Sequence, residues 1–418
     1  MKNFSIYFIL IVTFIMIKFS SKAQENNPLK YILENNPNLF KEILNDPNKK
    51  EIQIIYTQID RDIRNKPHFI TYKYNVNNKH YFYPASTIKL PVAIFALEKL
   101  NQINLNGVDK NTSLRIMSNF NEGTEVSEDT SALNGKPSIA NYIKKILLVS
   151  DNDAFNRLYD FVDRTLINKK LKYYGFKNSK VMNRLSASDT DESTRSTNPI
   201  EFYNDEGKIL YKKQFSYDRF NYPMKLDNLI QGVGYLDQNG ELIAKPMDFS
   251  GKNVFQLSDQ HELMKRLFFP EHFPSKKRFF LNPEDYDFLY TYMSKYPTEN
   301  QNPTFNSPNY YPTYCKFLFY GGDKNAYINP NIRIFNKVGD AYGYTIDNAY
   351  IINYQNKVEF ILSAVIQSNN NNIYNDDQYE YDEICLPFLK NLGQKIYEYE
   401  TNRFKKYLPN FDKMLKYK

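Results

Sequence analysis

Residue types that carry several common chemistries are scarce in this chain of 418 residues. Its four histidines, at positions 68, 80, 261 and 272, show no His-x-x-x-His spacing and no Cys–His cluster, so a zinc site is not expected. Its 14 glycines form no phosphate-binding loop. No serine lies in a Gly-x-Ser-x-Gly sequence, which leaves a Ser-His-Asp triad without support. We expect neither a metal nor a cofactor.

The chain also has few cysteines and only a modest net charge. Cys315 and Cys385 are too few for a disulfide framework, although they could pair in an oxidising compartment. Lys and Arg number 54 against 47 Asp and Glu, a formal net charge of +7. The basic pairs are scattered along the chain, which is typical of solvated surfaces and gives no support to nucleic-acid binding.

Outside the N-terminus, no apolar run approaches the length of a membrane span. Met1-Lys2-Asn3 precede a largely apolar run over 4–17, and the small residues Ser21 and Ala23 suit signal-peptidase cleavage before Gln24. The run is short for a membrane span, so a cleaved signal peptide over 1–23 is favoured over a membrane anchor. We expect a bacterial periplasmic or secreted protein with no membrane span after cleavage.

The first chemical feature is the stretch Tyr83-Pro84-Ala85-Ser86-Thr87-Ile88-Lys89. Ser86 and Lys89 are three residues apart, so on a helix they share one face. The run 88–97 is apolar nearly all round, which predicts a helix buried on every side. A buried lysine of lowered pKa can take the proton of a serine hydroxyl, and a helix N-terminus favours a developing oxyanion.

Two further short motifs follow in order. Ser150-Asp151-Asn152 lies between the predicted helices 139–148 and 153–162. Lys337-Val338-Gly339 ends the strand-like run 332–335. Ser-x-x-Lys, Ser-Asp-Asn and Lys-Thr-Gly, in this order, are the motifs of class A β-lactamases and penicillin-binding proteins. The chain resembles this superfamily of active-site serine enzymes from about residue 51 to its C-terminus, with Val338 where threonine is usual.

The resemblance implies a role for each motif residue. Ser86 would be the nucleophile and Lys89 the general base of acylation, while Ser150 would bridge the two lysines and pass a proton to the leaving amine. The substrate would be bound by Asn152, Lys337, Gly339 and Asp340, and the backbone N–H groups of Ser86 and Asp340 would form the oxyanion hole.

The chain departs from the family pattern in the region 183–193. No Glu-x-x-Leu-Asn sequence is present to activate a deacylating water; Glu192 and Asp189 are possible substitutes, although each is typical of a solvated loop charge. Val338 lacks the hydroxyl that helps to hold a β-lactam carboxylate, and the Asp340 side chain would repel an anionic substrate. Slow deacylation or altered selectivity therefore fits better than fast β-lactam hydrolysis.

The resemblance also implies an α+β fold. Strands are predicted over 51–60, 68–74, 331–337, 344–354 and 357–366, and together they would form one antiparallel sheet flanked by helices, with a last helix over 376–399. The sheet domain would be discontinuous, 24–84 with 306–418, and a helical domain would span 85–305. Within it, the runs 200–211 and 234–243 predict two hairpins, which we assign to an inserted β-rich flap over 200–250.

Three functions follow from these features. We expect an extracytoplasmic serine hydrolase that acts on amide bonds through an acyl-enzyme, with cell-wall-type peptides or β-lactams as substrates. The alternatives are a true class A-like β-lactamase, and a catalytically silent protein that binds a peptide or glycan on the same fold.

Overall fold

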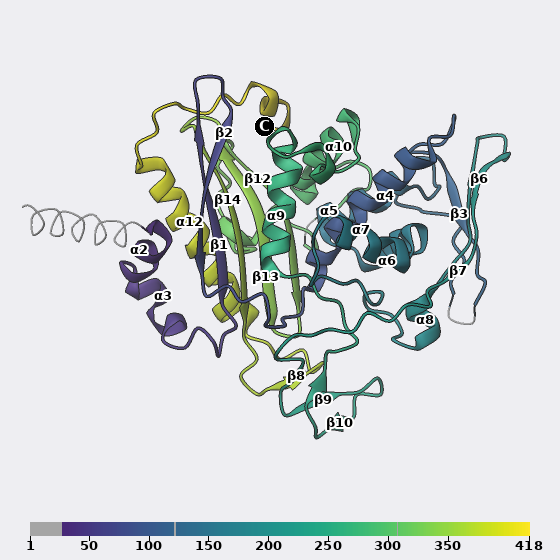
Figure 1. Ribbon diagram of the computed structural model, residues 1–418, viewed down its shortest axis with the longest axis horizontal. Coiled ribbons are helices and arrows are strands. Elements are labelled where there is room, and N and C mark those ends of the chain that lie inside the picture. The colour runs from purple at the N-terminus through teal and green to yellow at the C-terminus, as the bar shows by residue number, and fades with distance from the viewer. Residues whose placement is uncertain (1–26, 121–122, 307) are drawn as a thin grey trace, which may run out of the picture.

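A computed structural model describes residues 27–120, 123–306 and 308–418. The predicted signal peptide at 1–23 lies outside these residues. Figure 1 shows a twisted sheet with helices on both faces, a mainly helical part beside it, and small strand pairs at the periphery. The expected class, an antiparallel sheet flanked by helices plus a helical part with a β-rich insertion, is confirmed.

The central sheet has five strands in the order β12-β13-β14-β1-β2, and every neighbouring pair is antiparallel. All five strands lie within a few residues of the predicted positions. β12 is an edge strand, so one side of its backbone is free to face the helical part. The strands are β1 (Gln53–Arg61), β2 (Pro67–Tyr74), β12 (Ile332–Ala341), β13 (Tyr344–Asn353) and β14 (Val358–Gln367).

Helices cover both faces of this sheet. α2 (Pro28–Glu34), α3 (Pro37–Leu44) and α12 (Leu386–Asn402) pack against one face, where their apolar side chains form one cluster with those of the strands. α9 (Leu257–Phe268) and α10 (Pro283–Ser294) cover the other face. β13 and β14 are buried along their whole length because both of their faces are covered.

The last helix begins later than the predicted residue 376. Asn375 and Asp377 have φ values of 61° and 55°, a conformation that no α-helix accommodates. A single π-turn at Tyr381–Cys385 then leads into α12, with Pro387 in its first turn, where a missing N–H costs nothing. The prediction of a helix was therefore wrong for 376–380, where the chain turns, and 381–385 form a π-turn rather than part of the α-helix.

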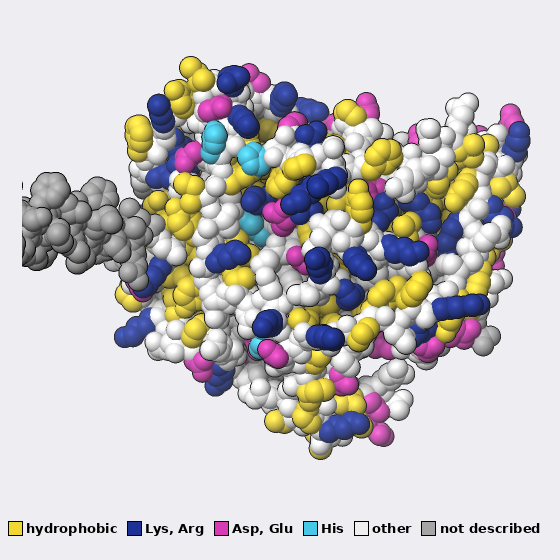
Figure 2. Space-filling model, in the orientation of Figure 1, with side chains coloured by type: hydrophobic (Ala, Val, Ile, Leu, Met, Phe, Trp, Pro, Cys, Tyr) yellow, Lys and Arg dark blue, Asp and Glu magenta, His cyan; other side chains and the backbone are white. Residues whose placement is uncertain are grey.

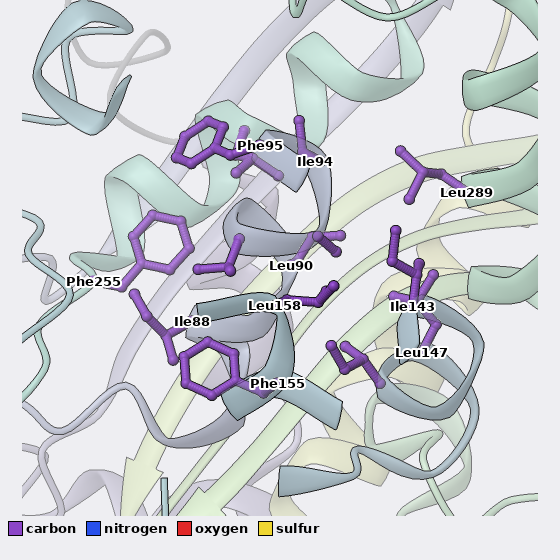
Figure 3. Packing of buried hydrophobic residues seen from close by; sticks show 14 of the residues in the cluster. Ile88, Leu90, Ile94, Phe95, Ile143, Leu147, Phe155, Leu158, Phe255 and Leu289 are labelled. Carbon is purple, nitrogen blue, oxygen red and sulfur yellow. The ribbon is translucent and has the colours of Figure 1, made fainter. Parts of the chain in front are cut away.

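The helical part is built around α4 (Lys89–Ile103), whose first eight residues are all buried. It packs with α5 (Ile139–Val149), α6 (Asn152–Val162) and α7 (Arg164–Tyr173). Figure 3 shows side chains from α4 and its neighbours meeting in one cluster, among them Ile88, Leu90, Ile94, Phe95, Ile143, Leu147, Phe155, Leu158, Phe255 and Leu289. This packing fixes the position of the residues at the start of α4.

The segment 200–250 forms both predicted hairpins, but at two separate places. β5 (Ile200–Tyr203) pairs with β6 (Ile209–Lys213) on one side and with β3 (Leu114–Ile116) on the other, at the far side of the helical part. β9 (Gly234–Leu236) and β10 (Leu242–Ile243) form the second hairpin at the other end of the segment. The remaining short elements are α8 (Asp191–Arg195), α11 (Phe317–Tyr320), β4 (Ser196–Thr197), β7 (Ser216–Tyr217), β8 (Ile230–Gln231), β11 (Met247–Asp248) and β15 (Ile373–Tyr374).

The surface agrees with the dispersed charge of the sequence. On the face shown in Figure 2, Lys and Arg side chains are interspersed with Asp and Glu. Among the helices in the described ranges, none combines the length and apolar character needed to cross a bilayer. Cys315 and Cys385 are buried free thiols, so the disulfide left open by the sequence is not formed.

Candidate active site

Ser86 stands in a turn of 3-10 helix, Ala85–Ile88, that runs directly into α4. Ala85 has a φ of 46°, a left-handed conformation that costs an alanine about 1–2 kcal/mol. Such backbone strain is concentrated at functional sites. Side chains three residues apart eclipse one another in a 3-10 helix, so Ser86 and Lys89 lie on one edge of this turn.

Lys89 is fully buried, and its ammonium group is held by the second motif. Its Nζ donates to the Ser150 carbonyl oxygen and, over 2.6 Å, to Asn152 Oδ1. Ser150 Oγ lies 3.4 Å from the same nitrogen. Burial, and then the positive charge of Lys337, lower the pKa of Lys89 well below its ordinary value. A neutral Lys89 can satisfy two acceptors with its two N–H groups and keep a lone pair.

Ser150 is the first of the two residues between α5 and α6, and its φ is 60°. This left-handed position, usually held by glycine or asparagine, turns the chain so that Ser150 and Asn152 both reach Lys89. Lys337 Nζ donates over 2.8 Å to Ser150 Oγ and over 2.7 Å to the Val338 carbonyl oxygen. Burial lowers the pKa of Lys337 to about 8. The Ser150 hydroxyl therefore lies between two lysine nitrogens.

Gly339 brings the edge strand against the serine turn. A Cβ placed on Gly339 would lie 2.6 Å from the backbone nitrogen of Ser86 and 2.9 Å from that of Thr87. Only a glycine permits this approach, because backbone atoms cannot give way as a flexible side chain can. The third motif thus brings β12 next to Ser86, which completes the convergence of the three sequence motifs.

The loop 183–193 also reaches the site, although without a carboxylate. Asn152 Nδ2 donates to Ser186 Oγ over 2.8 Å. Asp189 forms an ion pair with Lys252 and accepts a hydrogen bond from Asn183. In the part of the chain that the structure describes, neither Asp189 nor Glu192 is hydrogen-bonded to Lys89, Ser150 or Asn152.

The residues beside Gly339 face a different environment. Val338 is buried in the cluster beneath α12, whereas Asp340 is exposed. Burial raises the pKa of the nearby Cys315 thiol to about 11, so this thiol remains protonated at neutral pH. Within the described ranges, no three His, Cys, Asp or Glu side chains are grouped so that they could hold a metal ion.

Sequence reasoning missed Ser186, Cys315 and a group of tyrosines next to Ser150. Ser186 has no motif around it, and its approach to Asn152 depends on a left-handed turn at Ser186 itself, with a φ of 49°. The run Tyr310-Tyr311-Pro312-Thr313-Tyr314 is visible as an aromatic cluster, but nothing in its spacing relates it to residues 150 or 340.

Comparison with known proteins agrees with these motifs. Residues 39–219, which include the first two motifs, match the family described as "Beta-lactamase enzyme family". No curated protein matches the chain. Three solved structures are similar to it. A β-lactamase from Xanthomonas campestris is 13% identical, with 84% of this chain and 91% of that chain covered and a TM-score of 0.45. A β-lactamase from Sphaerobacter thermophilus is 11% identical (90% of this chain and 97% of that chain covered, TM-score 0.44), and PBP-A is 13% identical (90% of this chain and 96% of that chain covered, TM-score 0.48). The match over residues 39–219 confirms the resemblance to the β-lactamase and penicillin-binding-protein superfamily that the motifs indicate.

Proposed function

We propose that this protein is an extracytoplasmic active-site serine hydrolase that cleaves amide bonds through an acyl-enzyme on Ser86. The observation that carries the proposal is the buried Lys89 amine, whose hydrogen bonds go to Ser150 and Asn152. A lysine held without a carboxylate partner and with a lowered pKa can serve as a base at neutral pH.

Acylation begins with removal of the Ser86 proton by Lys89. With its two N–H groups on the Ser150 carbonyl and Asn152 Oδ1, the neutral amine has its lone pair available for a hydroxyl. Ser86 Oγ then attacks the substrate carbonyl, and the negative charge develops on the carbonyl oxygen. The backbone N–H groups of Ser86 and Asp340 would stabilise that charge, which the close approach of Gly339 to Ser86 supports.

Ser150 would carry the proton to the leaving amine. Its Oγ accepts from Lys337 and lies next to Lys89, so its own proton can pass to the leaving nitrogen while Lys89 replaces it. Lys337 holds Ser150 Oγ in place and keeps positive charge beside the reacting group. Asn152 accepts a hydrogen bond from Lys89 through its side-chain oxygen, and its side-chain N–H would donate to a carbonyl of the substrate.

Hydrolysis of the acyl-enzyme is expected to be slow. Asp189 is engaged by Lys252, and the loop contributes Ser186 rather than a carboxylate to the hydrogen-bonded group. A serine hydroxyl is a poor general base at neutral pH without a partner of its own. This favours a peptidase-like enzyme over a true class A-like β-lactamase.

Fluorescent penicillin and intact-mass analysis test the proposal. We expect one covalent adduct per chain, located on Ser86, that persists for minutes or longer, and no adduct in Ser86→Ala or Lys89→Ala. Ser275→Ala, at an exposed serine, is the matched control and should label normally.

Each other result favours a different function. Rapid turnover of the penicillin would indicate the β-lactamase alternative. Absence of labelling, together with no cleavage of D-amino-acid peptides or esters, would support the silent binding protein and overturn the proposal. Labelling retained in Lys89→Ala would remove Lys89 as the base.

A further inference from the structure

A cavity of about 200 Å³ opens directly beside Ser150. Val338 and Asp340 of β12 form one wall, on the far side of Gly339 from Ser86. The opposite wall comes from the loop that precedes α11 and from the π-turn that precedes α12. It contributes three tyrosines and a second carboxylate, namely Tyr311, Tyr314, Tyr381 and Asp382.

Two carboxylates, Asp340 and Asp382, line the cavity, and no basic residue does. Desolvation raises the pKa of Asp340, and the positive charges of Lys337 and Lys89 act against that rise. In the described part of the chain, neither Asp340 nor Asp382 takes part in an ion pair or accepts a side-chain hydrogen bond. Burial, then Cys315, and then Asp340 raise the pKa of Tyr314 to about 12. The same carboxylate raises the pKa of Tyr381, again after burial. Both tyrosines are therefore close enough to Asp340 to feel its field.

A second, independent feature indicates that the cavity receives a polar group. Thr345 of β13 lies opposite Asp340 in the strand register and lines the cavity. It is fully buried, and its hydroxyl makes no hydrogen bond of normal geometry. Its polar neighbour is the Cys385 thiol, which is a weak hydrogen-bonding group. A buried hydroxyl without a good partner is costly unless a ligand satisfies it.

The cavity continues into a larger open groove of about 880 Å³. The two share Tyr311, Tyr314, Asp382 and Leu386, and the groove runs outward past the first turns of α12, with Lys390 and Asp323 on its walls. A substrate that starts at Ser150 can thus extend through the cavity to solvent. The space suits a peptide rather than a small ring alone.

We propose that this cavity binds a positively charged group, an ammonium or guanidinium, on the leaving-group side of the scissile bond of a peptide substrate. The inference rests on the proposed function, because Ser150 is the residue that would protonate the leaving amine. Two carboxylates supply the opposite charge, and tyrosine rings attract a cation to their faces. Thr345 offers an acceptor for one N–H of the group.

Lys337 does not oppose this assignment. It is buried, and its two hydrogen bonds go to Ser150 Oγ and the Val338 carbonyl oxygen. It does not belong to the lining of the cavity, where a cation would meet Asp340 first. An anionic leaving group of the same size would instead approach two carboxylates in a lining that contains no basic residue.

Three thioesters with the same N-benzoyl-D-alanyl acyl group test the proposal. Their leaving thiols are thiocholine (cationic), 3,3-dimethylbutanethiol (neutral, of the same shape) and 3-mercaptopropionate (anionic). In each case the acyl group passes to Ser86 Oγ as the C–S bond breaks, the released thiolate takes up the serine proton, and water then frees the acid. The measurement is kcat/KM from released thiol.

We expect the cationic thioester to exceed the neutral one by about tenfold, and the anionic thioester to fall below it by a similar factor, as one or two unscreened charge contacts imply. The double variant Asp340→Asn, Asp382→Asn should remove most of this preference, measured as the ratio of kcat/KM for the cationic thioester to kcat/KM for the neutral thioester within the same variant. Glu383→Gln, at an exposed residue beside Asp382 that does not line the cavity, is the matched control and should keep the preference.

The outcomes separate the two proposals. Equal rates for the three thioesters, a preference for the anion, or a cation preference that survives in the double variant overturns the cation site and leaves the serine hydrolase intact. Failure of all three thioesters and of penicillin to acylate Ser86 overturns the proposed function and the cation site with it.

Discussion

The lowered pKa of Lys337 predicts a loss of acylation in mildly alkaline solution. Lys337 must be protonated to hold Ser150 Oγ and to keep positive charge in the site, and burial lowers its pKa to about 8. With that pKa, about 90% of the molecules carry the charge at pH 7 and about 10% at pH 9. The rate of acylation by a fluorescent penicillin, measured by stopped flow, should therefore fall about tenfold between these pH values.

The acylation rate should fall rather than rise with pH, because Lys337 must keep its proton whereas Lys89 must lose one. Lys89 must be neutral to act as base, so raising the pH cannot harm it, and burial already lowers its pKa well below the ordinary value. A falling alkaline limb therefore belongs to a group that must keep its proton. Lys337→Arg, whose guanidinium stays charged, should move this limb beyond pH 10 even if the overall rate is lower.

Two other buried lysines, Lys213 and Lys316, could imitate this behaviour, because burial lowers the pKa of each to about 8. Lys316 donates to the carbonyl oxygens of Met293 and Ile334 and to Asn336, and burial lowers its pKa to about 8 as well. Circular dichroism and thermal melting over pH 7 to 9 show whether the fold changes in this range. A limb that remains near pH 8 in Lys337→Arg, with the fold unchanged, would refute the role given to Lys337.

Two further predictions concern packing and a buried ion pair. Gly339→Ala should reduce the rate of acylation at least about 100-fold, because the added Cβ would lie 2.6 Å from the backbone nitrogen of Ser86 and force β12 away. Gly251→Ala is the control and should acylate normally, because its Cβ would have nothing within 4 Å. Equal acylation rates in the two variants would contradict the proposed geometry. Arg184→Met should lower the free energy of unfolding in urea by about 3–5 kcal/mol, because it leaves the Asp160 carboxylate buried without its partner. The exposed Arg219→Met is its control, and a similar loss there would contradict the assignment.

Much of the central architecture could be predicted from local pattern. The five sheet strands have a clear apolar pattern, and an Asn-Pro pair stands at the start of α2 (27–28) and at the start of α3 (36–37). Proline at the first helical position needs no N–H partner, so this signal depends on neighbouring residues alone. The chemical motifs were visible for the same reason, since each lies within four residues of chain.

Features that depend on contacts between distant segments were not accessible in this way. The Asn152–Ser186 hydrogen bond joins residues 34 apart, and the start of α12 is set by turns at Asn375 and Asp377 that no apolar pattern reveals. The cavity beside Ser150 combines residues near 311, 340 and 382. Its negative charge arises only when β12 and the π-turn meet. The division into two domains and the role of 200–250 as a flap remain predictions.

The hydrophobic cluster around α4 extends without interruption from the helical part to one face of the sheet, where it includes Phe335 and Ile352. The two halves therefore cannot melt independently, since opening the boundary between them would expose the interior of both. Calorimetry of the intact protein should accordingly record a single endotherm whose van't Hoff and calorimetric enthalpies agree. A fragment ending near residue 305 would expose the apolar side chains that pack against the sheet in the intact protein, and it should not fold alone.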